Sequence, residues 1–323
     1  MTPLRWGLLS TANINAAIVG GARTTDEAEI VAVASRDRAR GEAHAREHGI
    51  EQVHDSYEAL LEDAGVDAIY NPLPNSLHVP WTIKALNAGK HVLCEKPLTR
   101  RVTEAQQAFA AAEESGRLLA EAFMWRHHPQ AKRLVELVEE GTIGRLRLVR
   151  ATFTFPLREA TNIRLDPELD GGSLMDVGSY CVSGTRLLAG EPERVYGEQV
   201  LGGGGVDIAF SATLRFPADV LGQFDCGIAV SGRDELEAVG EDGSLFLDDP
   251  WHGKAPVIEV RRGGEVERVE TEAANSYGLE LADFARAVRG EAAPLLGAED
   301  AVAQARTIEA LYESADNGRP VAL

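Results

Sequence analysis

Two patterns of hydrophobic residues divide this chain. Over the first third, short apolar runs alternate with stretches that have helical spacing, which is the strand–helix alternation of a parallel α/β sheet. Strands are predicted at about 5–9, 30–34, 53, 66–70 and 91–94, and helices at about 15–22, 38–48, 57–62 and 81–88. This order is that of a doubly wound unit that binds a dinucleotide.

The alternation stops near residue 123. A helix is predicted over 129–140, followed by period-two runs at 146–155, 207–216, 220–228, 235–240 and 257–262. The glycines at 202–205 predict a hairpin turn, because no helix follows them as it would a phosphate loop. A last helix over 298–317 has apolar residues at helical spacing.

The sequence therefore predicts two domains. Residues 1–122 are expected to form an α/β Rossmann dinucleotide-binding domain. Residues 123–323 are expected to form an α+β substrate-binding and oligomerisation domain with a large, mostly antiparallel open sheet.

Charge and composition exclude several classes of partner. The net charge of −19 disfavours nucleic acid and anionic membranes. No apolar run reaches the length of a membrane span, and the start of the chain lacks the pattern of a secretory signal. Three cysteines without paired spacing suit a reducing compartment. We expect a cytoplasmic protein that acts on a small molecule.

The histidines of this sequence do not have the spacing of metal ligands. His44 to His48 match the H-x-x-E-H pattern of some zinc proteases, but the motif lies on a polar helix where no pocket is expected. The solvent-exposed interpretation is favoured there. His127 and His128 are adjacent and point in different directions on any regular element. No metal is predicted.

The turn after the first predicted strand is a degraded glycine fingerprint. Ser10 and Ala12 stand where two glycines are usual, and Asn15 replaces the third small residue. Ala12 still allows close approach of a pyrophosphate, and the helix start still offers free N–H groups. The predicted pyrophosphate contacts are Ser10, Thr11, Ala12, Asn13 and Ile14.

The end of the second strand bears on the choice of cofactor. Ser35 and Arg36 supply a hydroxyl and a planar cation where the adenosine ribose would lie, which suits the 2′-phosphate of NADP. Asp37 comes too late for the ribose role of an NAD enzyme. Arg38 follows as a further candidate. NADP is the predicted cofactor and NAD the alternative.

The fifth strand ends in a group of polar residues. The apolar run 92–94 is followed by Glu95, Lys96 and Pro97. Ligands of open α/β sheets bind beyond the carboxyl ends of the strands, so Lys96 is expected to project toward the ligand.

Nine segments resemble one family of oxidoreductases. They are Tyr70–His78, Gly89–Pro97, Glu121–Arg126, His128–Pro129, Asn162–Pro167, Gly171–Tyr180, Asn275–Tyr277, Glu280 and Phe284. In this order they are similar to the Gfo/Idh/MocA family of NAD(P)-dependent oxidoreductases. Within it they resemble the branch of dimeric dihydrodiol dehydrogenase, NADP-dependent D-xylose 1-dehydrogenase and glucose–fructose oxidoreductase.

The resemblance implies roles for particular residues. It makes Lys96 catalytic, with Tyr180 at the second catalytic position and Asp176 one helical turn before it. It adds cofactor contacts at Pro72, Asn75, His78, Glu95, Trp125 and Arg126. Asn162 and Arg164 are the candidates for the substrate side, with Asp176 and Tyr180.

The predicted reaction is hydride transfer between the nicotinamide and the carbon that bears a hydroxyl of a sugar or cyclic polyol. Either Tyr180 or Lys96 can carry the proton, and both versions stay open. An aldose 1-dehydrogenase with a D-xylose-like substrate comes first, and a trans-1,2-dihydrodiol dehydrogenase or keto-sugar reductase comes second. A non-catalytic NAD(P)-binding regulator is the alternative of another class. A homodimer or homotetramer is expected, because a family-type sheet exposes one face.

Overall fold

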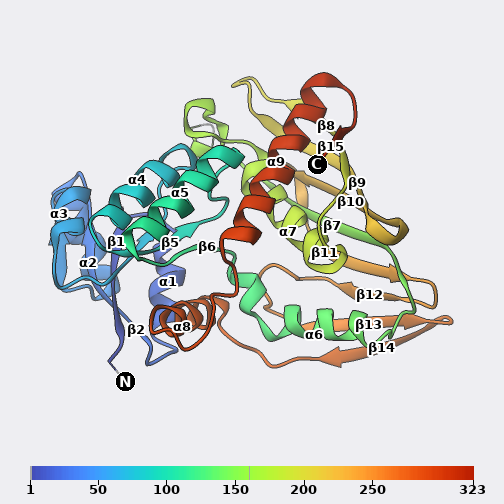
Figure 1. The fold of residues 1–323 in the computed structure, drawn as a ribbon, viewed down its shortest axis with the longest axis horizontal. Coiled ribbons are helices and arrows are strands. Elements are labelled where there is room, and N and C mark those ends of the chain that lie inside the picture. Colours follow the sequence, from blue (N-terminus) through green and yellow to red (C-terminus); the bar gives the residue numbers. More distant parts are fainter. Residues whose placement is uncertain (1, 160) are drawn as a thin grey trace. The chain divides into compact units, whose positions relative to one another are not determined.

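A computed structural model describes residues 2–159 and 161–323 (Figure 1). The chain forms two compact units. The first comprises Met1–His127 and Asn275–Val302, and the second comprises His128–Ala274 and Ala303–Leu323. The predicted domain boundary at residue 122 stays a prediction. By packing, the segment 275–302 belongs to the first unit, which brings a helix from far along the chain to the dinucleotide-binding half.

The first unit is built on a six-stranded parallel sheet. Its order is β3-β2-β1-β4-β5-β6, so the sheet grows outward from β1 in both directions, as in a doubly wound fold. The strands are β1 (Leu4–Leu9), β2 (Ala28–Ala34), β3 (Gln52–His54), β4 (Ala68–Asn71), β5 (His91–Glu95) and β6 (Leu119–Ala122). Most of their residues are buried, as expected of a sheet covered on both faces.

Helices cover both faces of this sheet (Figure 1). They are α1 (Asn15–Ala22), α2 (Arg38–His48), α3 (Tyr57–Glu62), α4 (Asn75–Asn87), α5 (Val102–Ser115), the 3₁₀ helix η1 (Met124–His127) and α8 (Ser276–Val288). α4 packs on α5, and α8 packs on α1. A Cβ added at Gly21 would lie 2.7 Å from the backbone nitrogen of Gly278, so this glycine allows the close approach of α1 and α8.

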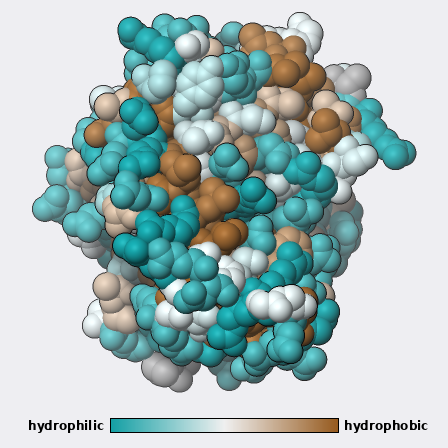
Figure 2. Space-filling view, turned by 90° about the vertical axis from the view of Figure 1, so that its right-hand side faces the viewer, coloured by the Kyte–Doolittle hydropathy of each residue, from teal (hydrophilic) through white to brown (hydrophobic). Residues whose placement is uncertain are grey.

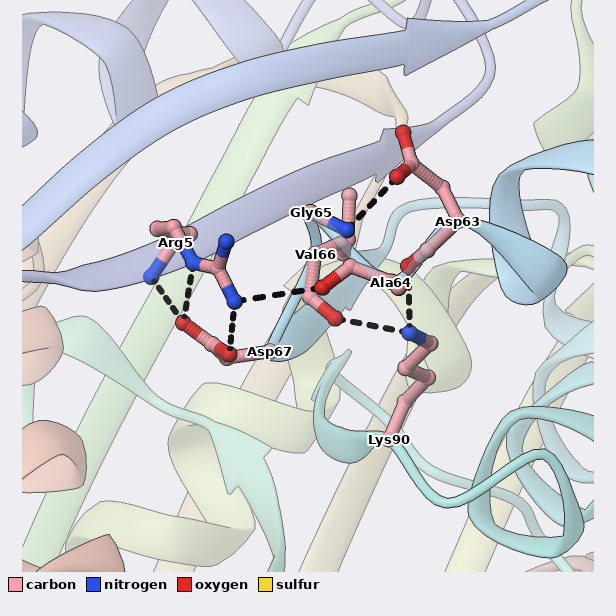
Figure 3. Close-up of polar contacts among 7 residues, drawn as sticks. All are labelled: Arg5, Asp63, Ala64, Gly65, Val66, Asp67 and Lys90. Atoms are coloured by element: carbon pink, nitrogen blue, oxygen red, sulfur yellow. Dashed lines mark hydrogen bonds and ion pairs between the residues drawn. The ribbon is translucent and has the colours of Figure 1, made fainter.

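The amino ends of the strands are fastened by hydrogen bonds (Figure 3). Arg5 donates from Nε and Nη2 to the two carboxylate oxygens of Asp67, at 2.8 and 2.7 Å. Lys90 Nζ donates to the carbonyls of Asp63 and Val66, at 2.6 and 2.7 Å. These contacts join the starts of β1, β4 and β5, at the end of the sheet opposite to Lys96.

The second unit is built on a nine-stranded sheet. Its order is β14-β13-β12-β11-β7-β10-β9-β8-β15, and among its described pairs only β7 and β10 run parallel. The strands are β7 (Leu146–Pro156), β8 (Arg194–Leu201), β9 (Asp207–Phe216), β10 (Val220–Gly227), β11 (Ala229–Gly240), β12 (Ser244–Leu247), β13 (Val257–Arg262), β14 (Glu265–Glu270) and β15 (Val321–Ala322).

Helices of this unit are α6 (Pro129–Glu139), α7 (Ser179–Ala189), which follows the π-helix η4 (Leu174–Gly178), and the part of α9 (Ala298–Asn317) from residue 303 onward. α7 packs on β7 and β10. The short 3₁₀ helices η2 (Ile163–Leu165), η3 (Pro167–Leu169) and η5 (Pro217–Asp219) lie in its loops.

One face of the large sheet is open. Along β10, Leu221 and Gln223 are exposed while Val220 and Phe224 are buried, which is the alternation of a sheet covered on one side. A hollow of about 390 Å³ on this sheet is lined by Arg150, Gln223, Glu237 and Phe246 among others. Figure 2, viewed from the side that carries the sheet's labels in Figure 1, shows hydrophobic residues within a mainly hydrophilic surface.

The predicted fold class is confirmed, and several element boundaries needed correction. Helix α4 begins at Asn75, six residues before the predicted start, and it continues past Pro80. β11 begins at Ala229, six residues before the predicted strand. The glycines at 202–205 do form the turn between β8 and β9, since Gly202 N–H donates to the Val206 carbonyl.

Candidate functional site

The turn after β1 has the geometry of a dinucleotide-binding loop. Ser10 adopts a φ of 92°, a left-handed conformation that favours glycine. This explains why the family fingerprint usually has glycine in this turn. α1 then begins at Asn15 without a side-chain cap among the described residues, so N–H groups at its start can bind pyrophosphate oxygens. Thr11, Ala12, Asn13 and Ile14 lie in this turn as predicted.

A polar contact that the sequence did not predict supports this turn. Asn15 is fully buried, and its Nδ2 donates to the Ser10 carbonyl at 2.8 Å. The same nitrogen lies 3.1 Å from Nε2 of His44 in α2. The solvent-exposed interpretation of the H-x-x-E-H motif is therefore wrong for His44, which is partly buried against α1. Helical spacing alone does not reveal which side of α2 faces a neighbouring loop.

The polar and charged residues that follow β2 differ in the partners they contact. Ser35 is buried, and its Oγ accepts from the Asp37 N–H at 3.2 Å. Asp37 caps α2 by accepting from the Arg40 N–H. Arg38 is paired with Glu42 and Asp55, each at 2.9 Å. Arg36 is exposed, with its guanidinium carbon 6.0 Å from the centre of the Tyr57 ring.

At the end of β5 the lysine backbone is held in place. The fully buried Tyr70 donates its hydroxyl to Oε1 of Glu95, and the Lys96 N–H donates to Oε2 at 3.2 Å. Burial and the Glu95 charge raise the pKa of Tyr70 well above its ordinary value, so it stays a donor. Glu95 thus accepts on both oxygens, which fixes the chain at Lys96.

The turn that follows is held by His78 from α4. Its Nδ1 lies 2.8 Å from the Pro97 carbonyl, and burial lowers the pKa of His78 to about 4. The neutral imidazole therefore donates to that carbonyl. Pro72 and Asn75 lie between β4 and the first turn of α4, beside this strand end. Their predicted cofactor contacts, and that of His78, stay predictions.

Helix α8 brings a buried acid to this unit. Glu280 is 2 % exposed, and its pKa is raised well above the usual range by burial and then by the charge of Glu95. Its Oε1 lies 3.9 Å from Nε2 of His127. Sequence reasoning placed Glu280 in a family motif without a role. The electrostatic influence of Glu95 on Glu280 could not be predicted from spacing, because almost 200 residues separate the two.

Trp125 and Arg126 lie on η1. The Trp125 side chain is buried, and the guanidinium carbon of Arg126 lies 5.8 Å from its ring centre. Arg126 also lies 3.7 Å from a carboxylate oxygen of Asp300. Their predicted contact with the nicotinamide end of the cofactor stays a prediction.

The second unit brings together most of the predicted substrate residues. Arg164 donates from Nε to the Asp176 carboxylate, and Asn162 accepts from the Arg164 N–H at 3.1 Å. Asp176 was predicted as a catalytic and substrate-side residue, and its ion pair with Arg164 was not predicted. Both side chains retain exposed surface, at 38 % for Arg164 and 13 % for Asp176.

Tyr180 is surrounded by aromatic rings. Its ring centre lies 5.3 Å from that of Phe153, edge to face, and 5.8 Å from that of Trp251. Trp251 is itself buried and donates from Nε1 to the Thr152 carbonyl. Neither aromatic neighbour was predicted, since they come from β7 and from the loop after β12.

The helix that carries this chemistry is irregular. Residues 174–178 form a π-helix, and the regular helix α7 begins only at Ser179. Asp176 lies inside the widened turn, so the prediction that it lies one regular helical turn before Tyr180 needs correction. π turns are uncommon and are frequently found at functional sites.

Among the described residues, one group has the spacing of metal ligands. Nδ1 of His252 lies 3.1 Å from Oδ2 of Asp234 and 3.6 Å from Oδ1 of Asp249. Ordinary ion pairing accounts for these distances. The expected lack of a metal stays a prediction.

Comparison with known proteins agrees with this geometry. Residues 7–123 match the oxidoreductase family with an NAD-binding Rossmann fold, and residues 131–246 match the GFO/IDH/MocA C-terminal domain. The chain belongs to the GFO/IDH/MocA family of oxidoreductases. It is thus an NAD(P)-dependent oxidoreductase, and the donors after β1 fit the pyrophosphate of such a cofactor.

Three relatives illustrate the range of activities. D-xylose 1-dehydrogenase (NADP(+)) 2 of Haloferax volcanii is 39% identical over 327 residues, which cover 99% of this chain and 100% of that protein. A dTDP-3,4-didehydro-2,6-dideoxy-alpha-D-glucose 3-reductase of Streptomyces violaceoruber is 40% identical over 81% of this chain and 78% of its own. The 3-ketoreductase KijD10 of Actinomadura kijaniata, solved with NADP and TDP-benzene, has a TM-score of 0.91 at 32% identity, over 97% of this chain and 98% of its own.

No helix among the described residues is long and apolar enough to cross a membrane.

Proposed function

We propose that this protein is an NADP-dependent aldose 1-dehydrogenase that acts on D-xylose or a similar sugar. The observation that carries the proposal is the 39% identity to a D-xylose 1-dehydrogenase (NADP(+)) along the full length of both chains. Lys96 and Tyr180, the residues that the family resemblance makes catalytic, are both present.

The spacing of these two residues supports their roles. KijD10 has been solved with one lysine changed to alanine and, separately, with one tyrosine changed to phenylalanine. Those two positions are separated by the same number of residues as Lys96 and Tyr180. We infer that the lysine after β5 and the tyrosine of α7 form the catalytic pair.

A bound NADP would supply the hydride acceptor for oxidation of the sugar carbon. The protein must then hold the sugar hydroxyl and remove its proton. Tyr180 is the proposed acid/base, with the Lys96 cation favouring its phenolate form. In the alternative version, Lys96 carries the proton and Tyr180 orients the hydroxyl. Arg164 donates to the Asp176 carboxylate and orients it, and a carboxylate is an acceptor for sugar hydroxyls.

The preference for NADP is proposed from the end of β2. Arg36 is exposed there, while Arg38 is already paired with two acids and Asp37 caps α2. Arg36 is therefore the arginine best suited to a 2′-phosphate, and Ser35 adds a hydroxyl. NAD is the alternative cofactor.

A keto-sugar reductase is the second candidate. The structural match to KijD10 and the identity to a Streptomyces 3-reductase favour it. A trans-1,2-dihydrodiol dehydrogenase is supported by relatives such as the mouse enzyme, which is 34% identical over 80% of this chain. The non-catalytic regulator is disfavoured by the presence of Lys96 and Tyr180.

The test is a substrate panel read at the absorbance of NADPH. The purified protein is mixed with NADP or NAD and D-xylose, D-glucose, myo-inositol or a trans-dihydrodiol, and a keto sugar is offered with NADPH. We expect NADP-dependent oxidation of an aldose, reduced at least a hundredfold in Tyr180→Phe. Tight NADP binding without turnover on any substrate would instead identify a regulator.

We further propose a cytoplasmic homodimer or homotetramer. The open face of the large sheet, with exposed Leu221 beside charged side chains, is a surface that a second copy would cover. The three buried free cysteines suit a reducing compartment. Light scattering on the eluted protein gives the mass, and a monomer at micromolar concentration would contradict the oligomer.

A further inference from the structure

The turn after β1, which is predicted to bind the cofactor's pyrophosphate, is held by one side-chain amide and one backbone hydrogen bond. Ser10, at a φ of 92°, is tied through its carbonyl to Asn15 Nδ2 and through its N–H to the Ala34 carbonyl at 3.1 Å. A non-glycine residue in this region costs about 1 kcal/mol or more, so the surrounding contacts must hold it there.

The second hydrogen of this amide points to His44. The contact is to the carbonyl oxygen of Ser10, which can only accept, so the nitrogen of the Asn15 amide must face it, which fixes the orientation of the amide. The same nitrogen lies 3.1 Å from Nε2 of His44. An amide nitrogen only donates, so Nε2 must present its lone pair. The contact therefore requires the neutral imidazole with its proton on Nδ1.

Protonation of His44 breaks this arrangement. With a hydrogen on Nε2, two donors face each other. Turning the amide over would satisfy the imidazolium, but would then set Oδ1 of Asn15 against the Ser10 carbonyl oxygen. Either way one contact of Asn15 is lost. Since Asn15 is fully buried, water cannot replace it.

We propose that His44 is a positioning residue for the dinucleotide, and that acidification weakens cofactor binding through His44 and Asn15. It acts through Asn15 on the Ser10 turn and touches no reacting atom. The inference rests on the dinucleotide-binding role of the first unit and is independent of the sugar substrate.

The surroundings of His44 set the pH range. Burial is the largest influence that lowers the pKa of His44, followed by His48, whose ring centre lies 4.4 Å away on the next turn. Arg40 lowers it further and Glu47 opposes this. Among the described residues these three side chains all belong to α2, and the facing group from α1 is the uncharged Asn15. His44 is therefore expected to gain its proton, and cofactor binding to weaken, at a pH below the ordinary histidine pKa of about 6.5.

The experiment measures the dissociation constants of NADP and NAD between pH 8 and pH 5.5 for the full-length protein and two variants. His44→Gln keeps an acceptor of similar reach without a titrating group, and His44→Phe keeps the bulk without an acceptor. NAD is included because the 2′-phosphate of NADP itself titrates near pH 6. His54→Gln removes a histidine elsewhere in the same unit and is the matched control.

We expect wild type and His44→Gln to bind equally at pH 8. As the pH falls, wild type should weaken roughly three- to tenfold relative to His44→Gln with both cofactors. His44→Phe should be weaker than wild type at pH 8 by a similar factor, with little further change, and His54→Gln should follow wild type.

Three results would overturn the proposal. The first is equal affinity of wild type and His44→Phe at pH 8. The second is a wild type whose cofactor affinity stays equal to that of His44→Gln down to pH 5.5. The third is tighter binding of wild type on acidification, which would make His44 a simple cation for the phosphates. Lack of any dinucleotide binding by wild type would instead contradict the proposed function itself.

Discussion

The two ends of the six-stranded sheet use charged residues in opposite ways. At the amino ends, Arg5 and Asp67 satisfy each other and Lys90 donates to two carbonyls (Figure 3). Each of these charges meets a partner of the same unit. This end holds the strands in register.

At the carboxyl ends, the polar groups are less completely satisfied by partners within the unit. Ser10 is in a conformation that favours glycine, and Oδ1 of the buried Asn15 lacks a hydrogen-bond partner among the described residues. Glu95 is occupied in holding the backbone before Lys96. Strain and unsatisfied polar atoms of this kind are usual where a ligand binds.

The difference teaches that position on the sheet decides what a charged residue does. Lys90 and Lys96 are six residues apart, one before β5 and one after it. The strand places one at the structural end and the other at the ligand end, as the fold requires. Substitutions at the amino end should change stability, and those at the carboxyl end should change binding or turnover.

The largest effect is expected for Lys96→Met. Loss of the ammonium group removes the cation or proton carrier of the proposed mechanism, so kcat should fall by roughly a thousandfold. Unfolding in urea should change by less than about 1 kcal/mol, because the variant keeps the backbone contacts of Glu95. A variant with near wild-type turnover would remove Lys96 from the catalytic site.

Arg36→Ala should alter cofactor preference. A charge-assisted contact with the 2′-phosphate contributes about 1.5–3 kcal/mol, so NADP binding should weaken at least tenfold while NAD binding is unchanged. Arg38→Ala is the matched control and should weaken NADP binding less, since Arg38 is already paired with Glu42 and Asp55. Equal losses in the two variants would contradict the assignment of Arg36.

Lys90→Met tests the amino end. The Asp63 and Val66 carbonyls lose their donor, so the free energy of unfolding should fall by about 1–3 kcal/mol. Turnover per folded molecule should stay at the wild-type value. Lys84→Met, at a side chain that is 54% exposed, serves as the control and should cost less than about 1 kcal/mol.

Asp67→Asn tests the role of the amino end through the pH dependence of stability. The hydrogen bond from Arg5 lowers the pKa of Asp67, so the carboxylate stabilises the fold above its unfolded pKa of about 3.9. This stabilisation is lost as the pH falls through the lowered folded pKa. Urea unfolding should show wild type about 1 kcal/mol more stable than Asp67→Asn from pH 7 to pH 5, with a smaller gap below pH 4. A gap that grows on acidification would contradict this.

Elements with a clear period could be predicted from the sequence. The helices Arg38–His48, Tyr57–Glu62 and Ala298–Asn317 and the strands Asp207–Phe216 and Val257–Arg262 have the predicted bounds. Strand Glu265–Glu270 was missed because its residues are mostly charged and exposed. Its register with β13 holds it in the sheet, and no apolar face marks it in the sequence.

Residues of the candidate site could be predicted where they belong to a family motif. Lys96 and Tyr180 followed from the family pattern, and the strand ends agree with the position of Lys96. The partners of these residues were not predictable. His44 beside Asn15, Glu280 beside His127 and the aromatic rings around Tyr180 are contacts between segments far apart in the sequence, and only packing brings them together.

The central claim is that the lysine at the carboxyl end of β5 serves catalysis and the one at the amino end serves the fold. The most direct measurement is the initial rate of NADPH formation from NADP and D-xylose for wild type, Lys96→Met and Lys90→Met, each divided by its folded fraction. We predict a wild-type rate in Lys90→Met and a rate near zero in Lys96→Met. Equal rates in the two variants, or no NADPH from wild type with any aldose, would contradict the account.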